Sequence, residues 1–238
     1  PSPGNPDAET IVAGRRGMFQ WRLEVRGTAA HSGLHYWDGR SALAAAARWV
    51  AEAEALSRNG GGPTVNTGRL VAGDASFVDH LGTAHELLGT ERQLNVVPDR
   101  AVVEGEVRFL RPRDSAEAVT HLRRLAEEVG SSSRTTMTFQ PGPEIPPVDP
   151  EGPHAALCRR TVDLATARGW RLEVETDRGG ISFPNFLADP GRIPILDGLG
   201  PVGGGMHTRE EMVNLESLRR RIVLLADLMA EDSRQDRR

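Results

Sequence analysis

The chain has 238 residues, enough for one large domain or two smaller ones, each with its own core. Its 29 Lys and Arg residues stand against 33 Asp and Glu residues, for a net charge of -4. The two signs are interspersed along the sequence, with no basic face or polybasic cluster to suggest binding to nucleic acid or a membrane surface. No apolar run approaches the roughly 20 residues that a membrane span needs, and the single cysteine, Cys158, excludes an internal disulfide framework.

Hydrophobic periodicity divides the first part of the chain into six elements. Alternating apolar and polar residues predict strands over 18–25, 64–71, 101–110 and 134–139, and helical spacing predicts helices over 38–57 and 115–130. The order strand, helix, strand, strand, helix, strand is that of the split βαβ, ferredoxin-like fold. Residues 74–93 form an insertion between the second and third strands. We interpret its His80 and His85 as surface residues, because their spacing is poor for two ligands on one helix face.

A proline-rich link at 141–147 is expected to end this region. Beyond it, the pattern predicts helices over 153–168 and 216–229 and strands over 171–175 and 193–196. Alternating helices and strands indicate an α/β layer, but two or three strands are too few to close a sheet. We therefore expect an α/β chain in which an α+β, ferredoxin-like region is followed by half of an α/β domain.

The segment from Asp197 to Glu211 carries the strongest local signal of chemistry. A short apolar run leads into a glycine-rich loop that presents His207, followed closely by two glutamates. Glycines let the backbone come close to an ion, and a neutral imidazole is a common metal ligand. The pattern indicates that His207 binds a metal; the alternative is a solvent-exposed loop histidine.

Four segments, in this order, resemble one known family. They are Gly27-Thr-Ala-Ala-His31-Ser-Gly33, Asn95-Val-Val-Pro-Asp99, Glu106-Val-Arg108, and Gly179-Gly-Ile-Ser182 together with the His207 loop. Together they are similar to the two-zinc amidohydrolases and metallopeptidases, which include glutamate carboxypeptidases, acetylornithine deacetylases, succinyl-diaminopimelate desuccinylases and aminoacylases. The resemblance covers nearly the whole chain apart from the insertion.

The resemblance implies a ferredoxin-like lid that is inserted into a zinc-binding catalytic domain and mediates dimerisation. On that basis, residues 15–142 are the lid, with the insertion at 74–93. Residues 1–14 are the end of a catalytic-domain loop and a linker, and residues 143–238 are the C-terminal half of the catalytic domain.

The chemistry that the resemblance implies is hydrolysis of an amide bond in a small N-acyl amino acid or peptide with a free carboxylate. Two zinc ions would lower the pKa of a bridging water, and a glutamate would act as general base. His207 matches the family's last zinc ligand. His31 matches the lid histidine that reaches across a homodimer to the substrate carbonyl, where an imidazole N–H stabilises the oxyanion. The alternative for His31 is a strand-end histidine that is bonded to backbone.

Four further residues match positions that contact substrate in the family. Asn95 and Arg108 match residues that hold the substrate's carboxylate, a group to which a guanidinium fork is well suited. The alternative for Arg108 is an ordinary ion pair with a neighbouring glutamate. Gly180 and Ser182 match the glycine-rich loop that lines the pocket.

Two departures from the family pattern bear on activity. The loop reads Gly179-Gly-Ile-Ser-Phe183-Pro184-Asn185, so Phe183 stands where many relatives have aspartate. The His-x-Asp ligand pair, the bridging aspartate, a further acidic ligand and the Glu-Glu segment, all upstream of the lid in the family, are absent from these residues. A chain with one zinc ligand is not expected to hydrolyse substrate alone. Its proline-rich start at Pro1, without an initiator methionine, predicts the C-terminal part of a longer protein.

Three functions are compatible with these observations. The first is a two-zinc hydrolase, completed by upstream residues, dimeric through its lid and cytoplasmic, without nucleic-acid or membrane partners. The second is a non-catalytic dimerisation or binding module, or a degenerate relative, which the Phe183 substitution and the insertion favour. The third is an unrelated ferredoxin-like ligand-sensing domain, which leaves the His207 loop unexplained. We adopt the first as the working hypothesis.

Overall fold

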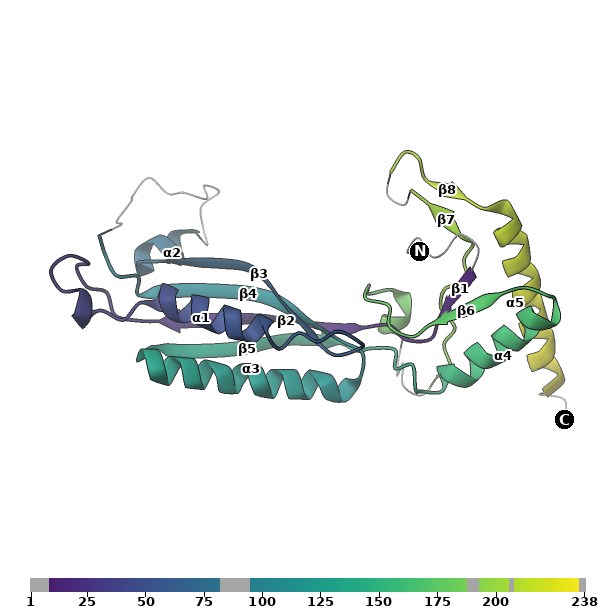
Figure 1. Ribbon diagram of the computed structural model, residues 1–238, viewed down its shortest axis with the longest axis horizontal. Coiled ribbons are helices and arrows are strands. Elements are labelled where there is room, and N and C mark those ends of the chain that lie inside the picture. The colour runs from purple at the N-terminus through teal and green to yellow at the C-terminus, as the bar shows by residue number, and fades with distance from the viewer. Residues whose placement is uncertain (1–8, 82–94, 188–192, 206–207, 236–238) are drawn as a thin grey trace. The chain divides into compact units, whose positions relative to one another are not determined.

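The computed structural model of the protein describes residues 9–81, 95–187, 193–205 and 208–235. The chain forms two compact units (Figure 1). Unit 2 is Gly17–Ile145, and unit 1 combines Pro1–Arg16 with Pro146–Arg238. The polypeptide enters unit 2 once and leaves it once, so unit 2 is an insertion within the sequence of unit 1. No helix among the described residues has both the length and the apolar character that a membrane crossing requires.

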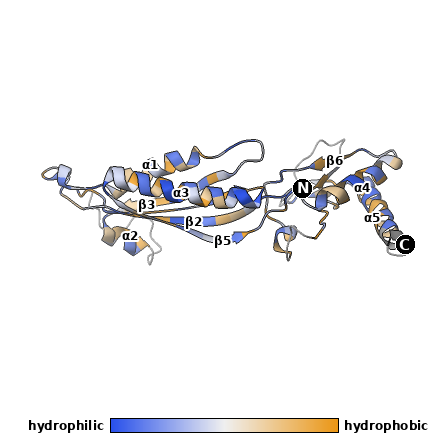
Figure 2. Ribbon diagram, turned by 90° about the horizontal axis from the view of Figure 1, so that it is seen from below, coloured by the Kyte–Doolittle hydropathy of each residue, from blue (hydrophilic) through white to orange (hydrophobic). Residues whose placement is uncertain are grey.

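Unit 2 is a four-stranded antiparallel sheet with two long helices on one face (Figure 2). Its elements are β2 (Gly17–Arg26), α1 (Ala42–Glu54), β3 (Thr64–Gly73), α2 (Ala75–Leu81), β4 (Arg100–Phe109), α3 (Pro112–Ser133) and β5 (Thr136–Ile145). The strand order is β3-β4-β2-β5. The β2, α1, β3, β4, α3 and β5 elements therefore form the predicted ferredoxin-like fold. The short helix α2, which begins the insertion and contains His80, contacts β3 and β4.

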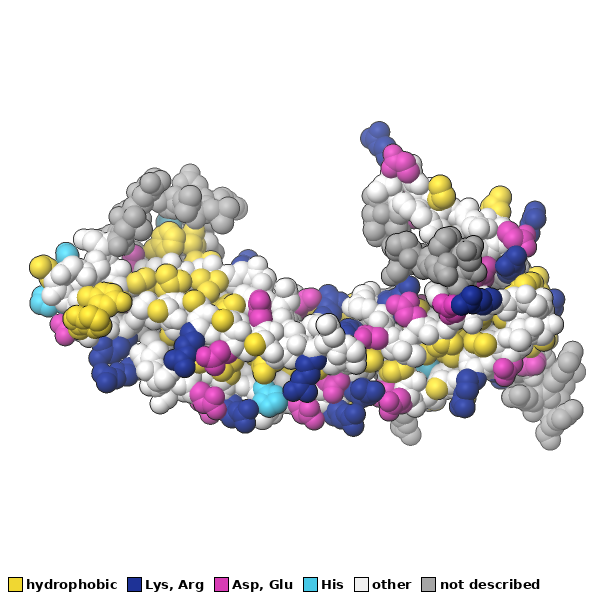
Figure 3. Space-filling model, viewed as in Figure 1, with side chains coloured by type: hydrophobic (Ala, Val, Ile, Leu, Met, Phe, Trp, Pro, Cys, Tyr) yellow, Lys and Arg dark blue, Asp and Glu magenta, His cyan; other side chains and the backbone are white. Residues whose placement is uncertain are grey.

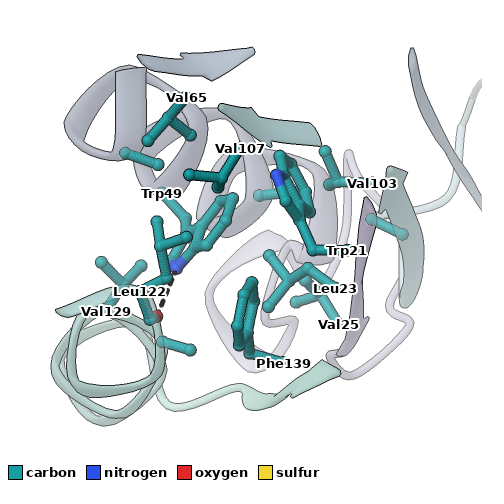
Figure 4. Packing of buried hydrophobic residues seen from close by; sticks show 14 of the residues in the cluster. Trp21, Leu23, Val25, Trp49, Val65, Val103, Val107, Leu122, Val129 and Phe139 are labelled. Carbon is teal, nitrogen blue, oxygen red and sulfur yellow. Dashed lines mark hydrogen bonds between the residues drawn. The ribbon is translucent and has the colours of Figure 1, made fainter. Parts of the chain in front are cut away.

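The core of unit 2 lies between the sheet and the helices α1 and α3. Trp21 of β2, Trp49 of α1 and Phe139 of β5 meet there, with the two indole rings 5.2 Å apart and edge to face (Figure 4). The indole N–H of Trp49 donates to the Leu122 carbonyl of α3 at 3.4 Å. Full burial of each large apolar side chain stabilises a fold by roughly 1.5–3 kcal/mol, so this cluster holds both helices against the sheet.

The proline-rich link is not where the sequence pattern puts it. Strand β5 continues through Pro141 and Pro143 to Ile145, so the prediction that residues 141–147 are a separate linker is wrong for their first five positions. Prolines are tolerated in this strand because it pairs only with β2 and its other side is an edge, where no N–H is needed for a ladder. The two chain crossings between the units are therefore the peptide bonds before Gly17 and after Ile145.

Unit 1 has a parallel pair of strands with helices packed beside it. Its elements are β1 (Glu9–Val12), α4 (His154–Ala167), β6 (Leu172–Glu175), a 3₁₀ turn (Phe183–Phe186), β7 (Gly203–Gly204), β8 (Met212–Val213) and α5 (Leu215–Gln235). Buried residues of β1, α4, β6 and α5 form its core. The strand predicted over 193–196 is not formed, and the chain there makes only one bridge, between Asp197 and Val12. A run of four residues that includes Pro194 leaves too few backbone donors for a ladder.

Candidate functional site

His31 lies in a tight turn that follows β2. The turn fixes which ring nitrogen of the neutral imidazole carries the hydrogen. The Nδ1 atom accepts hydrogen bonds from the backbone N–H groups of Gly33 at 3.1 Å and Leu34 at 3.3 Å. An Nδ1 that accepts cannot carry a proton, so a neutral His31 carries its hydrogen on Nε2. The side chain is exposed. His31 therefore presents an N–H donor on its outer edge, which is the form that the predicted oxyanion role requires.

Asn95 lies beside this turn. Its carbonyl accepts a hydrogen bond from the Ser32 N–H at 2.9 Å, and the next residue, Val96, forms a bridge with His31. Segments that are about 60 residues apart in the sequence are thereby joined at one end of the sheet. The structure brings the predicted residues His31 and Asn95 together.

Arg108 lies at the opposite end of the same sheet. It pairs with Met18 across β4 and β2, whereas Arg100, at the start of β4, pairs with Arg26 near the His31 turn. Eight residues of strand separate Arg100 from Arg108, about 27 Å at about 3.4 Å per residue. One small substrate cannot contact both Arg108 and the His31 turn of the same chain.

The guanidinium of Arg108 is engaged by a neighbour on its own strand. Its Nε and Nη2 atoms donate to the two carboxylate oxygens of Glu106 at 2.9 and 3.1 Å. The ordinary ion pair considered above is thus present, and a substrate carboxylate would compete with Glu106 for the same fork. The role of Arg108 in substrate binding stays a prediction.

The glycine-rich loop of unit 1 is organised by a residue to which the sequence analysis assigned no role. The buried side chain of Asn185 accepts from the Ser182 N–H at 3.0 Å and donates to the carbonyls of Arg16 at 3.1 Å and Pro146 at 2.8 Å. One amide thus joins the predicted substrate loop to the two chain segments on which unit 2 is inserted. Asn185 was visible in the sequence as part of the family-like loop, but only its burial and its partners identify its role.

Phe183 stands at the loop position for which the resemblance implies an aspartate. Its side chain is 74% exposed, while the following Pro184 is buried. The loop therefore presents an aromatic ring, and no carboxylate, at this position.

A second unpredicted residue, Arg15, holds the carbonyl of Gly180. Its Nη1 donates to that oxygen at 2.6 Å, and its Nε donates to the carboxylate of Asp197 at 2.7 Å. Asp197 in turn accepts from the Gly198 N–H at 2.7 Å. Arg15 therefore fixes both the predicted substrate loop and the start of the segment that leads to His207.

The metal prediction rests on a residue that lies outside the described part of the chain. His207 is one of the residues that the structure does not describe. Among those that it does describe, no three His, Cys, Asp or Glu side chains are grouped closely enough to hold a metal ion. These residues therefore do not fit a two-zinc site by themselves.

Comparison with known proteins agrees with this architecture. Residues 13–133, just over half of the chain, match the family M20_dimer, the peptidase dimerisation domain. A probable carboxypeptidase of Paracoccidioides brasiliensis (strain Pb18) is 28% identical over 208 residues, which cover 82% of this chain and 42% of the relative. One from Aspergillus niger (strain ATCC MYA-4892 / CBS 513.88 / FGSC A1513) is 31% identical over 118 residues, 44% of this chain and 24% of that protein. The chain thus spans less than half the length of these curated relatives.

Solved structures share the fold at lower identity. The aminopeptidase PepT from Bacillus cereus ATCC 10987 aligns with a TM-score of 0.71 at 21% identity, over 94% of this chain and 54% of that chain. The YXEP protein of Bacillus subtilis, a dinuclear metal binding peptidase from the M20 family, aligns with a TM-score of 0.64 at 19% identity, with the same coverage. The fold and the family match agree with the predicted resemblance, and the chain belongs to the M20 peptidase family, whose dimerisation domain it contains.

Proposed function

We propose that the protein hydrolyses an amide bond in a small N-acyl amino acid or peptide that has a free carboxylate, as a homodimer through unit 2. The names of the curated relatives, probable carboxypeptidases, support peptide-bond hydrolysis with a carboxylate next to the cleaved bond. The family match over 13–133 supports dimerisation.

The observation that carries this proposal is the state of His31. A donor N–H on an exposed turn, with the other ring nitrogen held by two backbone N–H groups, is preorganised to stabilise negative charge on a carbonyl oxygen. Preorganised donors are effective because they need no rearrangement when charge develops in the transition state. The two hydrogen bonds of the turn also fix the orientation of the ring, whereas the ring of an isolated surface histidine would have no fixed orientation.

The separation along β4 supports a site that is shared between two chains. His31 and Asn95 of one chain are about 27 Å or more from Arg108 of the same chain, so one substrate can meet all three only if Arg108 comes from the other chain. In that arrangement, Arg108 would bind the carboxylate, and His31 of the partner chain would donate to the scissile carbonyl. Dimerisation would then be required for turnover, and not only for stability.

The described residues do not complete the metal site of this proposal. His207 is proposed as one ligand of a two-zinc site, and the described residues offer no group of three ligands to accompany it. We therefore assign no catalytic step to the metal here. The proposal takes the further ligands and the general base from residues other than those that the structure describes.

The test is metal content and hydrolysis measured on two proteins in parallel. The full-length protein, expressed from its complete reading frame, is dialysed against a weak chelator and assayed for zinc per chain and for release of amino acid from N-acetyl amino acids. The 238-residue chain is the matched control. Two zinc ions and turnover in the first, with neither in the second, would support the proposal. No metal and no turnover in the full-length protein would contradict it and favour a non-catalytic dimerisation module, the alternative that Phe183 suggests.

A further inference from the structure

Three large apolar side chains stand in solvent directly after His31. Leu34 is 75% exposed, Tyr36 53% and Trp37 85%. Figure 3 shows apolar and histidine side chains gathered at the end of unit 2 that carries this turn. Isolated exposed apolar residues need no explanation, but an almost fully exposed tryptophan beside a second aromatic ring and a leucine marks a binding surface.

This aromatic turn, residues 34–37, is held in one shape. The His35 N–H donates to the His31 carbonyl at 2.9 Å, and the Tyr36 and Trp37 rings meet edge to face at 5.0 Å. The Arg40 guanidinium donates to the Trp37 carbonyl at 2.8 Å. Rigid aromatic side chains bind with little loss of conformational entropy, so the turn is preorganised for contact.

The size of the aromatic turn argues for a small ligand as its occupant. Each of the two aromatic side chains buries at most about 150–250 Å², so these two and Leu34 by themselves offer less than the roughly 800 Å² per partner that a standard protein interface needs. His35 within the turn and Asp38 and Arg40 after it are polar, and the His35 Nδ1 lies 3.4 Å from the Asp38 Oδ2. A polar rim around a few apolar side chains suits one apolar group of a substrate.

We infer that the aromatic turn selects substrates that carry an aromatic or other large apolar group next to the scissile amide. The inference rests on the proposed function, because it assumes that His31 contacts the substrate carbonyl. The hydrogen bond between His35 and His31 makes the imidazole and the two rings parts of one turn. In this inference, a group attached to the carbon or nitrogen of the scissile amide contacts Trp37.

The experiment compares four substrates that differ only in their rings: N-acetyl-alanine, N-benzoyl-alanine, N-acetyl-phenylalanine and N-benzoyl-phenylalanine. The full-length, zinc-loaded protein is assayed as wild type, Trp37→Ala and Trp37→Phe, with Leu43→Ala as a control for loss of an exposed apolar side chain elsewhere in unit 2. We expect Trp37→Ala to lower kcat/KM by about tenfold or more for substrates whose ring lies on the side of the amide, acyl or amino acid, that contacts Trp37. Loss of a hydrophobic contact in a pocket has an effect of this size. N-acetyl-alanine should be little affected, and Trp37→Phe should keep most of the preference. The oligomeric state of each variant is measured by light scattering.

The outcomes separate this inference from the function on which it rests. If the wild type hydrolyses the set but Trp37→Ala lowers kcat/KM equally for all four substrates, or for none, the selectivity role is wrong and the hydrolase proposal stands. If Trp37→Ala converts dimers into monomers, the aromatic turn is an interface between chains, and the inference is also wrong. If the wild type loaded with zinc hydrolyses none of the four, the proposed function and this inference fail together.

Discussion

Arg15 and Asp197 form an ion pair inside unit 1, with the arginine side chain 9% exposed and the aspartate 22% exposed. The pair joins the segment after β1 to the start of the loop that contains His207. Arg15 also donates to the Gly180 carbonyl, so one guanidinium satisfies acceptors on two loops. A buried charge that loses its partner destabilises the fold. Because Arg15 is more buried than Asp197, removing Asp197 should destabilise the protein more than removing Arg15.

We predict that Asp197→Ala destabilises the protein by about 3 kcal/mol, because it leaves Arg15 charged and buried without its counter-ion. Arg15→Met should cost less, because the more exposed Asp197 can be solvated in its absence. Urea unfolding of both single variants and the double variant gives the change in unfolding free energy for each. The double variant should lose less than the sum of the singles, since the two residues interact directly. Strict additivity would show that the pair is not coupled.

For His31, we predict that alanine lowers turnover of the full-length protein by about 10²–10³-fold, the usual cost of removing one oxyanion donor. The side chain is exposed, so the unfolding free energy should change by no more than about 0.5 kcal/mol. His31→Asp is the matched variant, because its carboxylate oxygens can still accept from the backbone of the turn but have no N–H to donate. If His31→Asp restores turnover, the imidazole acts by shaping the turn and not as a donor.

Gly105 and Gly68 give a matched test of how closely the sheet of unit 2 is packed. A Cβ at Gly105 in the central strand β4 would lie 2.1 Å from the Asn66 carbonyl oxygen and 2.4 Å from Cζ2 of Trp21. At Gly68, in the edge strand β3, the nearest atom would be 3.5 Å away. Gly105→Ala should therefore cost about 1–3 kcal/mol through overpacking, while Gly68→Ala should be close to neutral. Thermal unfolding of the two variants compares them directly, and equal midpoints would contradict the argument.

The sequence predicted unit 2 well because its signals are local. Residues Phe19, Trp21, Leu23 and Val25 alternate with polar residues, and all four are buried on one face of β2. Its helices were also predicted, although α1 begins at Ala42. Ser41 is its N-cap, and the Ser41 side chain accepts a hydrogen bond from the Ala44 N–H at 3.1 Å. Asp38, where the helix was expected to start, belongs to a separate 3₁₀ turn.

Unit 1 was predicted less well because its elements are held by contacts between segments that are far apart in the sequence. Strand β1 is only four residues long and is recognisable only through its pairing with β6, about 160 residues later. The roles of Arg15 and Asn185 depend on hydrogen bonds to segments far away in the sequence, which periodicity does not reveal. The proximity of His31 to Asn95, and the distance of both from Arg108, likewise follow from strand register and not from spacing.

The Arg16–Asp177 pair predicts how the stability of unit 1 depends on pH. Arg16 donates to both carboxylate oxygens of Asp177, at 2.6 and 2.8 Å, and these hydrogen bonds hold the pKa of Asp177 below its ordinary value of 3.8. A depressed pKa adds stability that is present above pH 3.8 and is lost as the pH falls through the lower, folded-state value. We predict that Asp177→Asn costs about 1 kcal/mol at neutral pH, a value discounted for its partial exposure. The cost should shrink toward zero in strong acid. Urea unfolding from pH 7 downward tests this, and a constant difference would contradict it.

The two edges of the unit 2 sheet differ in a way that predicts which one pairs with a second chain. Edge strand β5 carries Pro141 and Pro143, which have no N–H to donate, whereas edge strand β3 carries no proline. Prolines protect an edge against strand addition, so β3 is the edge that is open to pairing.

We predict that single cysteines in β3 crosslink the proposed homodimer and that cysteines in β5 do not. The native Cys158 is buried, so thiols added at exposed positions report separately. Asn66→Cys on β3 and Thr138→Cys on β5 are both exposed and form the matched pair. After treatment with a short bismaleimide at low protein concentration, a denaturing gel should show covalent dimers for Asn66→Cys only. Dimers from Thr138→Cys alone would assign the interface to β5 instead. Dimers from neither, with a dimer still present by light scattering, would move the interface away from both edges and onto the helices or the aromatic turn.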